Sequence, residues 1–86
     1  MEEKFEAKFQ IGKSGVTAGT IESFKLAFKT HRQLRISVLK SAGRDRNSIR
    51  EMALKIQEKL GFPTGSRIIG FTIILVRLKR LKKQGL

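Results

Sequence analysis

The fold of this chain is decided by the stretch FEAKFQIGKSG at residues 5–15. Its first seven residues alternate between apolar and polar side chains, which is the period-two pattern of a half-buried β-strand. Glycines at positions 12 and 15 end that alternation. Beyond them, Thr17 can cap a helix that runs to about His31. We therefore predict a strand, a short glycine loop and a helix, in that order.

Two sets of side chains recur at helical spacing along this first helix. One set is apolar and the other is basic: Ile21, Phe24, Ala27 and Phe28 against Lys25, Lys29 and Arg32. A second alternating strand follows at residues 34–38. Two strands joined by a helix of this length predict a parallel pair.

The second half of the chain predicts another helix and a hairpin. The helix is expected from about Ser48 to Leu60, with Asp45 or Asn47 as its cap and residues 40–47 as a basic loop before it. Residues 64–66 (TGS) are interpreted as a turn. In the apolar run at residues 67–76, Gly70 indicates a bulge or a hairpin turn, and we favour the hairpin. The predicted fold class is α/β (α+β), a β-α-β-α-β-β chain with a mixed four-stranded sheet backed by two helices.

Composition narrows the classes of function. The 86 residues suffice for one core, and 19 Lys and Arg against 7 Asp and Glu give a formal net charge of +12. Such an excess favours a polyanionic partner, since it destabilises the free fold by self-repulsion. The absence of cysteine removes disulfides, thiolate zinc sites and a cysteine nucleophile. A charged N-terminus and a longest apolar run of residues 71–76 lead us to expect a cytoplasmic protein without signal peptide or membrane span.

The loop Gly12-Lys13-Ser14-Gly15 is suited to a phosphate group. Its glycines permit close backbone approach, the next helix begins nearby, and Lys13 adds a charge. A nucleotide-binding phosphate loop is a weaker interpretation, because a strand stands where that motif needs a flexible stretch. In a KH domain the GxxG loop would join two helices, which the preceding strand also disfavours.

Three segments in chain order resemble the CRM domain family, named for chloroplast RNA splicing and ribosome maturation, which includes the bacterial YhbY-like proteins. They are IGKSGVTAG at residues 11–19, LRISVL at 34–39 and IGFTIILVR at 69–77. The resemblance implies a fold similar to the C-terminal domain of initiation factor three, RNA binding, and association with precursors of the large ribosomal subunit. Family members usually carry an N-terminal helix before the first strand, and we do not expect one in this sequence. We expect a CRM-like RNA-binding domain at residues 1–77 and a basic tail at 78–86.

We therefore expect an RNA-binding protein that contacts ribosomal RNA through its backbone, as a component or assembly factor of the large ribosomal subunit. The alternative is a basic protein-interaction or membrane-surface module. We expect no enzymatic activity, cofactor, metal or small-molecule substrate, because His31 is the only histidine and no acid–base pair or nucleophile can be assembled. With no Tyr or Trp, recognition should address the backbone more than the bases, and Phe62 and Phe71 stay open between core packing and stacking. The predicted RNA-binding residues are Gly12, Lys13, Ser14, Gly15, Lys25, Lys29, Arg32, Arg44, Arg46, Arg77 and Arg80.

Overall fold

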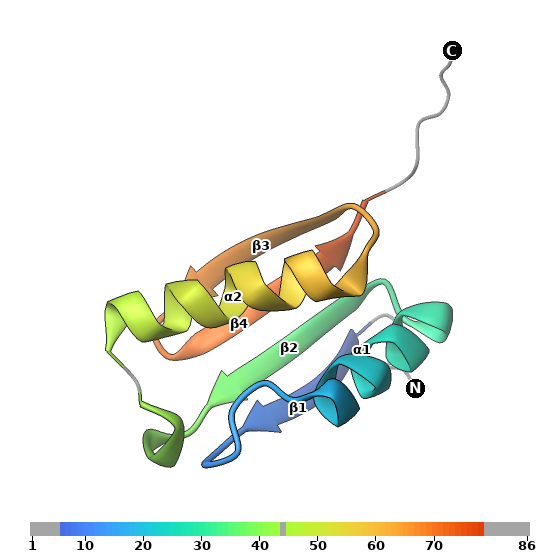
Figure 1. Cartoon of the computed structure of the whole chain (residues 1–86). Coiled ribbons are helices and arrows are strands. Elements are labelled where there is room, and N and C mark those ends of the chain that lie inside the picture. Colours follow the sequence, from blue (N-terminus) through green and yellow to red (C-terminus); the bar gives the residue numbers. More distant parts are fainter. Residues whose placement is uncertain (1–5, 44, 79–86) are drawn as a thin grey trace.

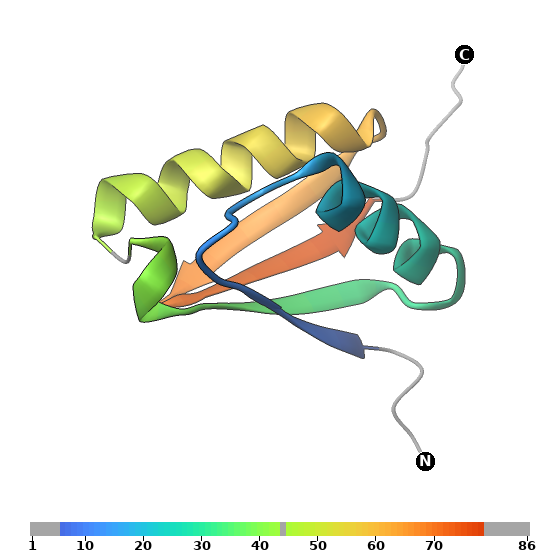
Figure 2. The same cartoon turned by 60° about the horizontal axis from the view of Figure 1, so that its bottom comes forward.

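The computed structural model describes residues 6–43 and 45–78, which form a four-stranded sheet with two helices on one of its faces (Figures 1 and 2). The predicted β-α-β-α-β-β order is confirmed. In chain order the elements are β1 (Glu6–Ile11), α1 (Ala18–Thr30), β2 (Gln33–Val38), the 3-10 helix η1 (Lys40–Ala42), α2 (Arg46–Leu60), β3 (Thr64–Ile69) and β4 (Thr72–Arg77).

The sheet is mixed, with the strand order β1-β2-β4-β3. β1 runs parallel to β2, in a register that pairs Glu6 with Gln33 and Ile11 with Val38. β4 pairs antiparallel with both β2 and β3. Gly70 turns the chain between β3 and β4 with a φ of 61°, a left-handed conformation that glycine adopts without strain. The predicted parallel pair and the favoured hairpin are both confirmed.

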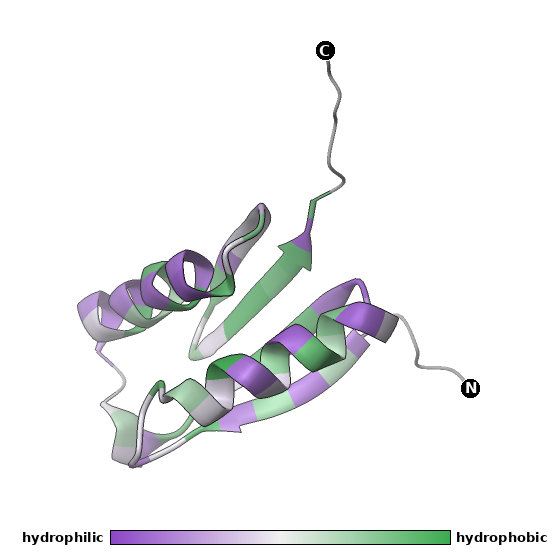
Figure 3. Ribbon diagram, turned by 45° about the vertical axis from the view of Figure 1, so that its right-hand side comes forward, coloured by the Kyte–Doolittle hydropathy of each residue, from purple (hydrophilic) through white to green (hydrophobic). Residues whose placement is uncertain are grey.

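The core lies between the sheet and the two helices. Phe24 is 1% exposed, and its ring meets that of Phe9 edge to face with the centroids 5.0 Å apart. In Figure 3 β4 is hydrophobic along most of its length, whereas hydrophilic and hydrophobic residues alternate along the helices. The buried side chains that form this core cluster come from every element except β3 and η1: Ile11, Ile21, Phe24, Phe28, Leu34, Ile36, Val38, Ile49, Ala53, Ile56, Leu60, Ile73 and Leu75.

Both helices begin at a side-chain cap. Thr17 Oγ1 accepts a hydrogen bond from the Thr20 backbone N–H at 3.2 Å, which confirms the predicted start of α1. Asp45 caps α2, since its carboxylate accepts from the Ser48 N–H at 3.3 Å and from the Ser48 hydroxyl at 2.6 Å. The Ser48 hydroxyl and N–H bonds lower the pKa of the Asp45 carboxyl, because they stabilise its charged form. α2 ends at Gly61, whose φ is 77°.

Two predicted boundaries are wrong. The segment at residues 64–66 is the start of β3 and not a turn, because it pairs with β4 from Thr64 opposite Arg77 onward. The Gln57 side-chain amide also donates to the Thr64 carbonyl at 2.7 Å and ties this strand to α2. Residues 40–47 are not one loop: they contain η1, and α2 already begins at Arg46 because Asp45 is its cap.

Replacing Phe24 by alanine should destabilise the fold strongly. The substitution removes a buried ring between α1 and the sheet, so the free energy of unfolding should fall by about 3–5 kcal/mol. Leu26→Ala on the same helix is the matched control, because Leu26 is 60% exposed and its loss should change the free energy by less than about 0.5 kcal/mol. Urea unfolding followed by circular dichroism measures both. Equal losses for the two variants would contradict the packing described here.

Candidate nucleic-acid interface

The Gly12–Gly15 loop is a tight turn between β1 and α1. The Gly15 N–H donates to the Gly12 carbonyl at 2.9 Å, and Gly15 has a left-handed φ of 68°. Lys13 and Ser14 lie exposed at the tip of this turn. Beside it, the Leu39 N–H donates to the Ile11 carbonyl at 2.9 Å, so the loop and the segment before η1 are joined at the end of the sheet (Figure 1). The turn thus presents a lysine and a hydroxyl on a fixed backbone.

Behind the loop, a groove of about 390 Å³ lies between the first half of α1 and the second half of α2. We call it the lysine groove. Lys25 of α1 and Lys55 and Lys59 of α2 line it together, and the start of α1 adjoins it. The first N–H groups of a helix have no intrahelical acceptor and favour an anion. The groove is lined by Val16, Thr17, Ala18, Ile21, Glu22, Lys25, Lys55 and Lys59.

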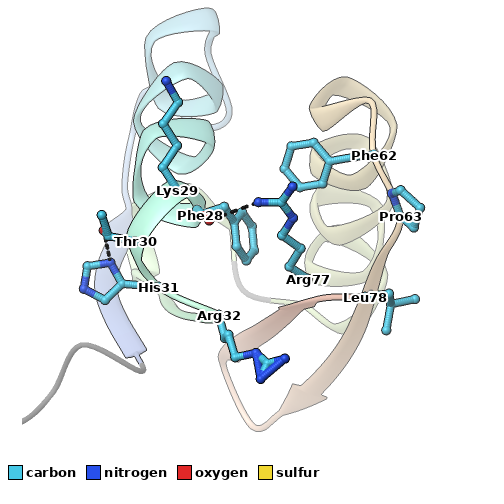
Figure 4. A pocket seen from close by; sticks show the side chains of 9 residues that line it. All are labelled: Phe28, Lys29, Thr30, His31, Arg32, Phe62, Pro63, Arg77 and Leu78. Carbon is cyan, nitrogen blue, oxygen red and sulfur yellow. Dashed lines mark hydrogen bonds between the residues drawn. The ribbon is translucent and has the colours of Figure 1, made fainter. Parts of the chain in front are cut away.

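A second hollow, of about 500 Å³, lies where the end of α1, the α2–β3 connection and the end of β4 meet (Figure 4). We call it the arginine pocket. Lys29 and Arg32 contribute cations from α1 and the segment after it, and Arg77 contributes one from β4. His31 caps the end of α1, since its N–H donates to the Ala27 carbonyl at 2.8 Å. The pocket is lined by Phe28, Lys29, Thr30, His31, Arg32, Phe62, Pro63, Arg77 and Leu78.

The two hollows follow one another along the same pair of helices. Lys25 in the groove and Lys29 in the pocket are one helical turn apart on α1, about 6 Å along its axis. Lys59 in the groove precedes Phe62 in the pocket by three residues. We call the whole path the basic track; its cations are Lys13, Lys25, Lys29, Arg32, Lys55, Lys59 and Arg77. Since α1 has 13 residues, the track extends about 20 Å.

The charge of the basic track is not neutralised internally by the part of the chain that the structure describes. The ion pair formed within residues 6–43 and 45–78 joins Arg35 to Glu6, with Nη1 3.7 Å from Oε2. It lies on the face of the sheet away from the helices, because Arg35 alternates with buried Leu34 and Ile36. Glu22 lines the lysine groove without forming an ion pair there. The track is therefore a strip of net positive charge.

The structure brings together most of the predicted RNA-binding residues, but in separate groups. Lys25 lies behind the glycine loop, whereas Lys29, Arg32 and Arg77 share the arginine pocket. Arg46 lines a different hollow, with Arg50 and Phe71 near the tip of the β3–β4 hairpin. Arg44 and Arg80 lie outside the described residues.

Sequence reasoning missed Lys55, Lys59 and the position of Phe62. The two lysines are four residues apart on the exposed side of a predicted helix, a spacing that places them on one face. That signal could have identified a pair of cations. It could not have shown that they face α1, because this depends on how the two helices cross the sheet.

In the described ranges, no three His, Cys, Asp or Glu side chains gather as a metal site would require. None of the helices described combines the length and the apolar character needed to cross a membrane.

Comparison with known proteins identifies a family and a similar solved structure. A sequence model of the CRS1 / YhbY (CRM) domain matches residues 1–77. The fold is similar to the solution structure of a hypothetical protein from Staphylococcus aureus regarded as a candidate RNA-binding protein. The TM-score is 0.66 and the identity 22%, over 87% of this chain and 74% of that chain. This structural similarity shows the fold alone. Among curated proteins, none matches the chain.

The two loop glycines should respond differently to alanine. Gly15→Ala forces a Cβ into a left-handed conformation, so the free energy of unfolding should fall by about 1–2 kcal/mol. Gly12→Ala is the control, because its Cβ would meet Leu39 Cδ1 and Ser41 Oγ at 3.5 Å, an ordinary contact. Its cost should stay below about 0.5 kcal/mol. Thermal unfolding of the two variants measures these losses. A larger loss of unfolding free energy for Gly12→Ala than for Gly15→Ala would contradict the turn geometry.

Proposed function

The chain belongs to the CRS1 / YhbY (CRM) domain family, and we propose that it binds RNA along the basic track. The observation that carries this proposal is the convergence of Lys25, Lys55 and Lys59 from two helices beside the glycine loop. No carboxylate of the described residues pairs with them. Three ammonium groups at one groove repel one another, and a row of phosphates would relieve that repulsion.

The shape of the track favours a nucleic-acid backbone over a compact anion. Lys13 at the loop and Arg77 at the far end are separated by roughly the length of α1, about 20 Å. A single phosphate or nucleotide would occupy only one part of such a strip. An extended polyanion would contact all of it, with Lys13 and the backbone of the tight Gly12–Gly15 turn facing the sugar-phosphate chain.

The proposed target is ribosomal RNA of the large subunit, contacted in the cytoplasm as a ribosomal component or assembly factor. The sequence resemblance to the bacterial YhbY-like proteins supports this choice, and so does the net charge of +12, which suits a particle rich in phosphate. The proposed role is binding, without a chemical step.

Salt titration of RNA binding tests the basic track. If about six phosphates are neutralised on single-stranded RNA, the logarithm of the affinity should fall with the logarithm of salt concentration with a slope of about −4. Lys55→Gln combined with Lys59→Gln should make this slope shallower by about 1.4, since each lysine contributes about 0.7.

The matched control is Lys8→Gln combined with Arg67→Gln, which removes the same charge from the face of the sheet away from the helices. Both side chains are exposed. The control should leave the slope close to that of the unmodified protein. A flat salt dependence would refute RNA binding by charge, and equal effects of the two double variants would remove the lysine groove from the interface.

Sedimentation of cell extracts tests the ribosomal target. The protein should travel with large-subunit particles, and its presence on mature 70S ribosomes after a salt wash would identify a structural component. Presence on immature particles alone would identify an assembly factor. Recovery in liposome fractions that withstand nuclease, with none on ribosomal particles, would instead favour a membrane-surface module.

A further inference from the structure

The arginine pocket differs chemically from the lysine groove. Aromatic and apolar side chains form part of its wall, from Phe62, Pro63 and Leu78, and the last turn of α1 closes one side. Leu78 is 49% exposed, so apolar surface is open to a ligand here. A volume of about 500 Å³ lies within the usual range for small organic groups. The pocket can thus enclose a ring and not only an ion.

Arg77 is fixed in this pocket by three contacts. Its Nη1 donates to the Phe28 carbonyl at 3.2 Å, and its Cζ lies 4.9 Å from the centroid of the Phe62 ring. Its backbone N–H donates to the Arg32 carbonyl at 3.0 Å. Phe62 is itself positioned by Phe28, edge to face at 5.7 Å. Figure 4 shows the guanidinium beside the Phe62 ring, with its hydrogen bond to the Phe28 carbonyl drawn as a dashed line. The planar group is therefore preorganised.

This arrangement leaves hydrogen-bonding capacity for a ligand. A guanidinium has five N–H donors, and among the described residues the acceptor that it reaches is the Phe28 carbonyl. The last carbonyls of α1 are acceptors at the same place. A nucleobase edge carries both donors and acceptors, and its flat faces can pack on a phenyl ring or a guanidinium. Phosphate would use neither the apolar wall nor the carbonyls, and the negative end of the helix dipole disfavours it.

The arginine pocket lies where a base of an RNA strand that follows the lysine groove could enter it. Lys29 extends along α1 away from Arg77, and Arg32 lies on the other side of the pocket (Figure 4). Both are exposed cations. A strand that follows the lysine groove past Lys25 reaches Lys29 one turn later, at the pocket. Phosphates on either side of an inserted base would then meet Lys29 and Arg32.

We propose that the arginine pocket receives one unpaired base of the bound RNA, packed against the Phe62–Arg77 pair. The inference rests on the RNA binding proposed above and adds to it a contact that reads a base and not only the backbone. It assigns Phe62 and Arg77 a role in selecting single-stranded over paired RNA, since a base within a duplex is not free to enter the pocket.

The first test compares two oligomers of equal length and charge, one a single-stranded RNA and the other a fully abasic analogue with the same sugar-phosphate chain. The base-bearing oligomer should bind the unmodified protein about tenfold more tightly, because stacking of one base contributes about that factor. Equal affinities would overturn the pocket proposal and leave backbone binding intact. Failure of both oligomers to bind would refute the proposed function itself.

The second test locates the preference. Arg77→Lys keeps the charge but loses the planar group, and Phe62→Leu keeps apolar volume but loses the ring. Each should reduce the tenfold preference to about twofold, while circular dichroism confirms the fold. Arg50→Lys and Phe71→Leu make the same changes outside the pocket and should leave the preference at its original value. Persistence of the preference in both Arg77→Lys and Phe62→Leu would overturn the proposal, because the base would then be bound elsewhere.

Variants in the lysine groove test whether the base is bound there and not in the arginine pocket. Lys55→Gln combined with Lys59→Gln should weaken both oligomers by the same factor, since the phosphates are common to them. A loss confined to the base-bearing oligomer would place the base in the groove and contradict its assignment to the arginine pocket.

Discussion

The packing of both helices against the same face of the sheet is the constraint on which the rest of the structure depends. α1 and α2 each bury an apolar stripe over the central strands, where Leu34, Ile36 and Leu75 have no exposed surface. Four of the seven cations of the basic track are direct neighbours in sequence of buried helix residues. Lys25 and Lys29 follow Phe24 and Phe28, while Lys55 and Lys59 precede Ile56 and Leu60. Burying the stripes therefore brings the lysines of the two helices together at the seam. The basic track is thus a consequence of how the core packs.

This arrangement has an electrostatic cost in the free protein. Like charges that line one groove repel one another, most strongly at low salt where screening is weak, and so they oppose the packing that creates the groove. The chain tolerates the repulsion because the apolar burial is larger and the lysine side chains reach into solvent. A bound polyanion would reverse the sign of this contribution. Binding and stability should therefore be coupled, most strongly at low salt.

Much of the fold could be predicted from local patterns. The alternation over residues 6–11, the Thr17 cap and the apolar stripe containing Phe24 each predict a local structure, and the structure shows it. Local composition gave a wrong prediction of a turn at residues 64–66, because Thr, Gly and Ser are typical of turns. There, pairing with β4 outweighs the preference of the single residues, and only the partner strand reveals it.

The candidate site was less predictable for a related reason. Lys25 and the glycine loop are local features, so the sequence alone indicates them as candidates. Lys55 shares a groove with Lys25, and Phe62 contacts Arg77, although each pair joins segments that are far apart in the chain. Such contacts follow from how the helices and β4 pack together. No spacing within one element carries that information.

The central claim is that RNA lies along the helix side of the molecule, over the seam between α1 and α2. Nuclear magnetic resonance titration of the isotopically labelled protein with a single-stranded RNA tests it most directly. The account predicts amide shift changes that follow the basic track, from Lys13 through Lys25 and Lys59 to Phe62 and Arg77. Lys8, Arg35 and Arg67, on the opposite face of the sheet, should change little. Changes concentrated on that opposite face, with the track unaffected, would contradict the account.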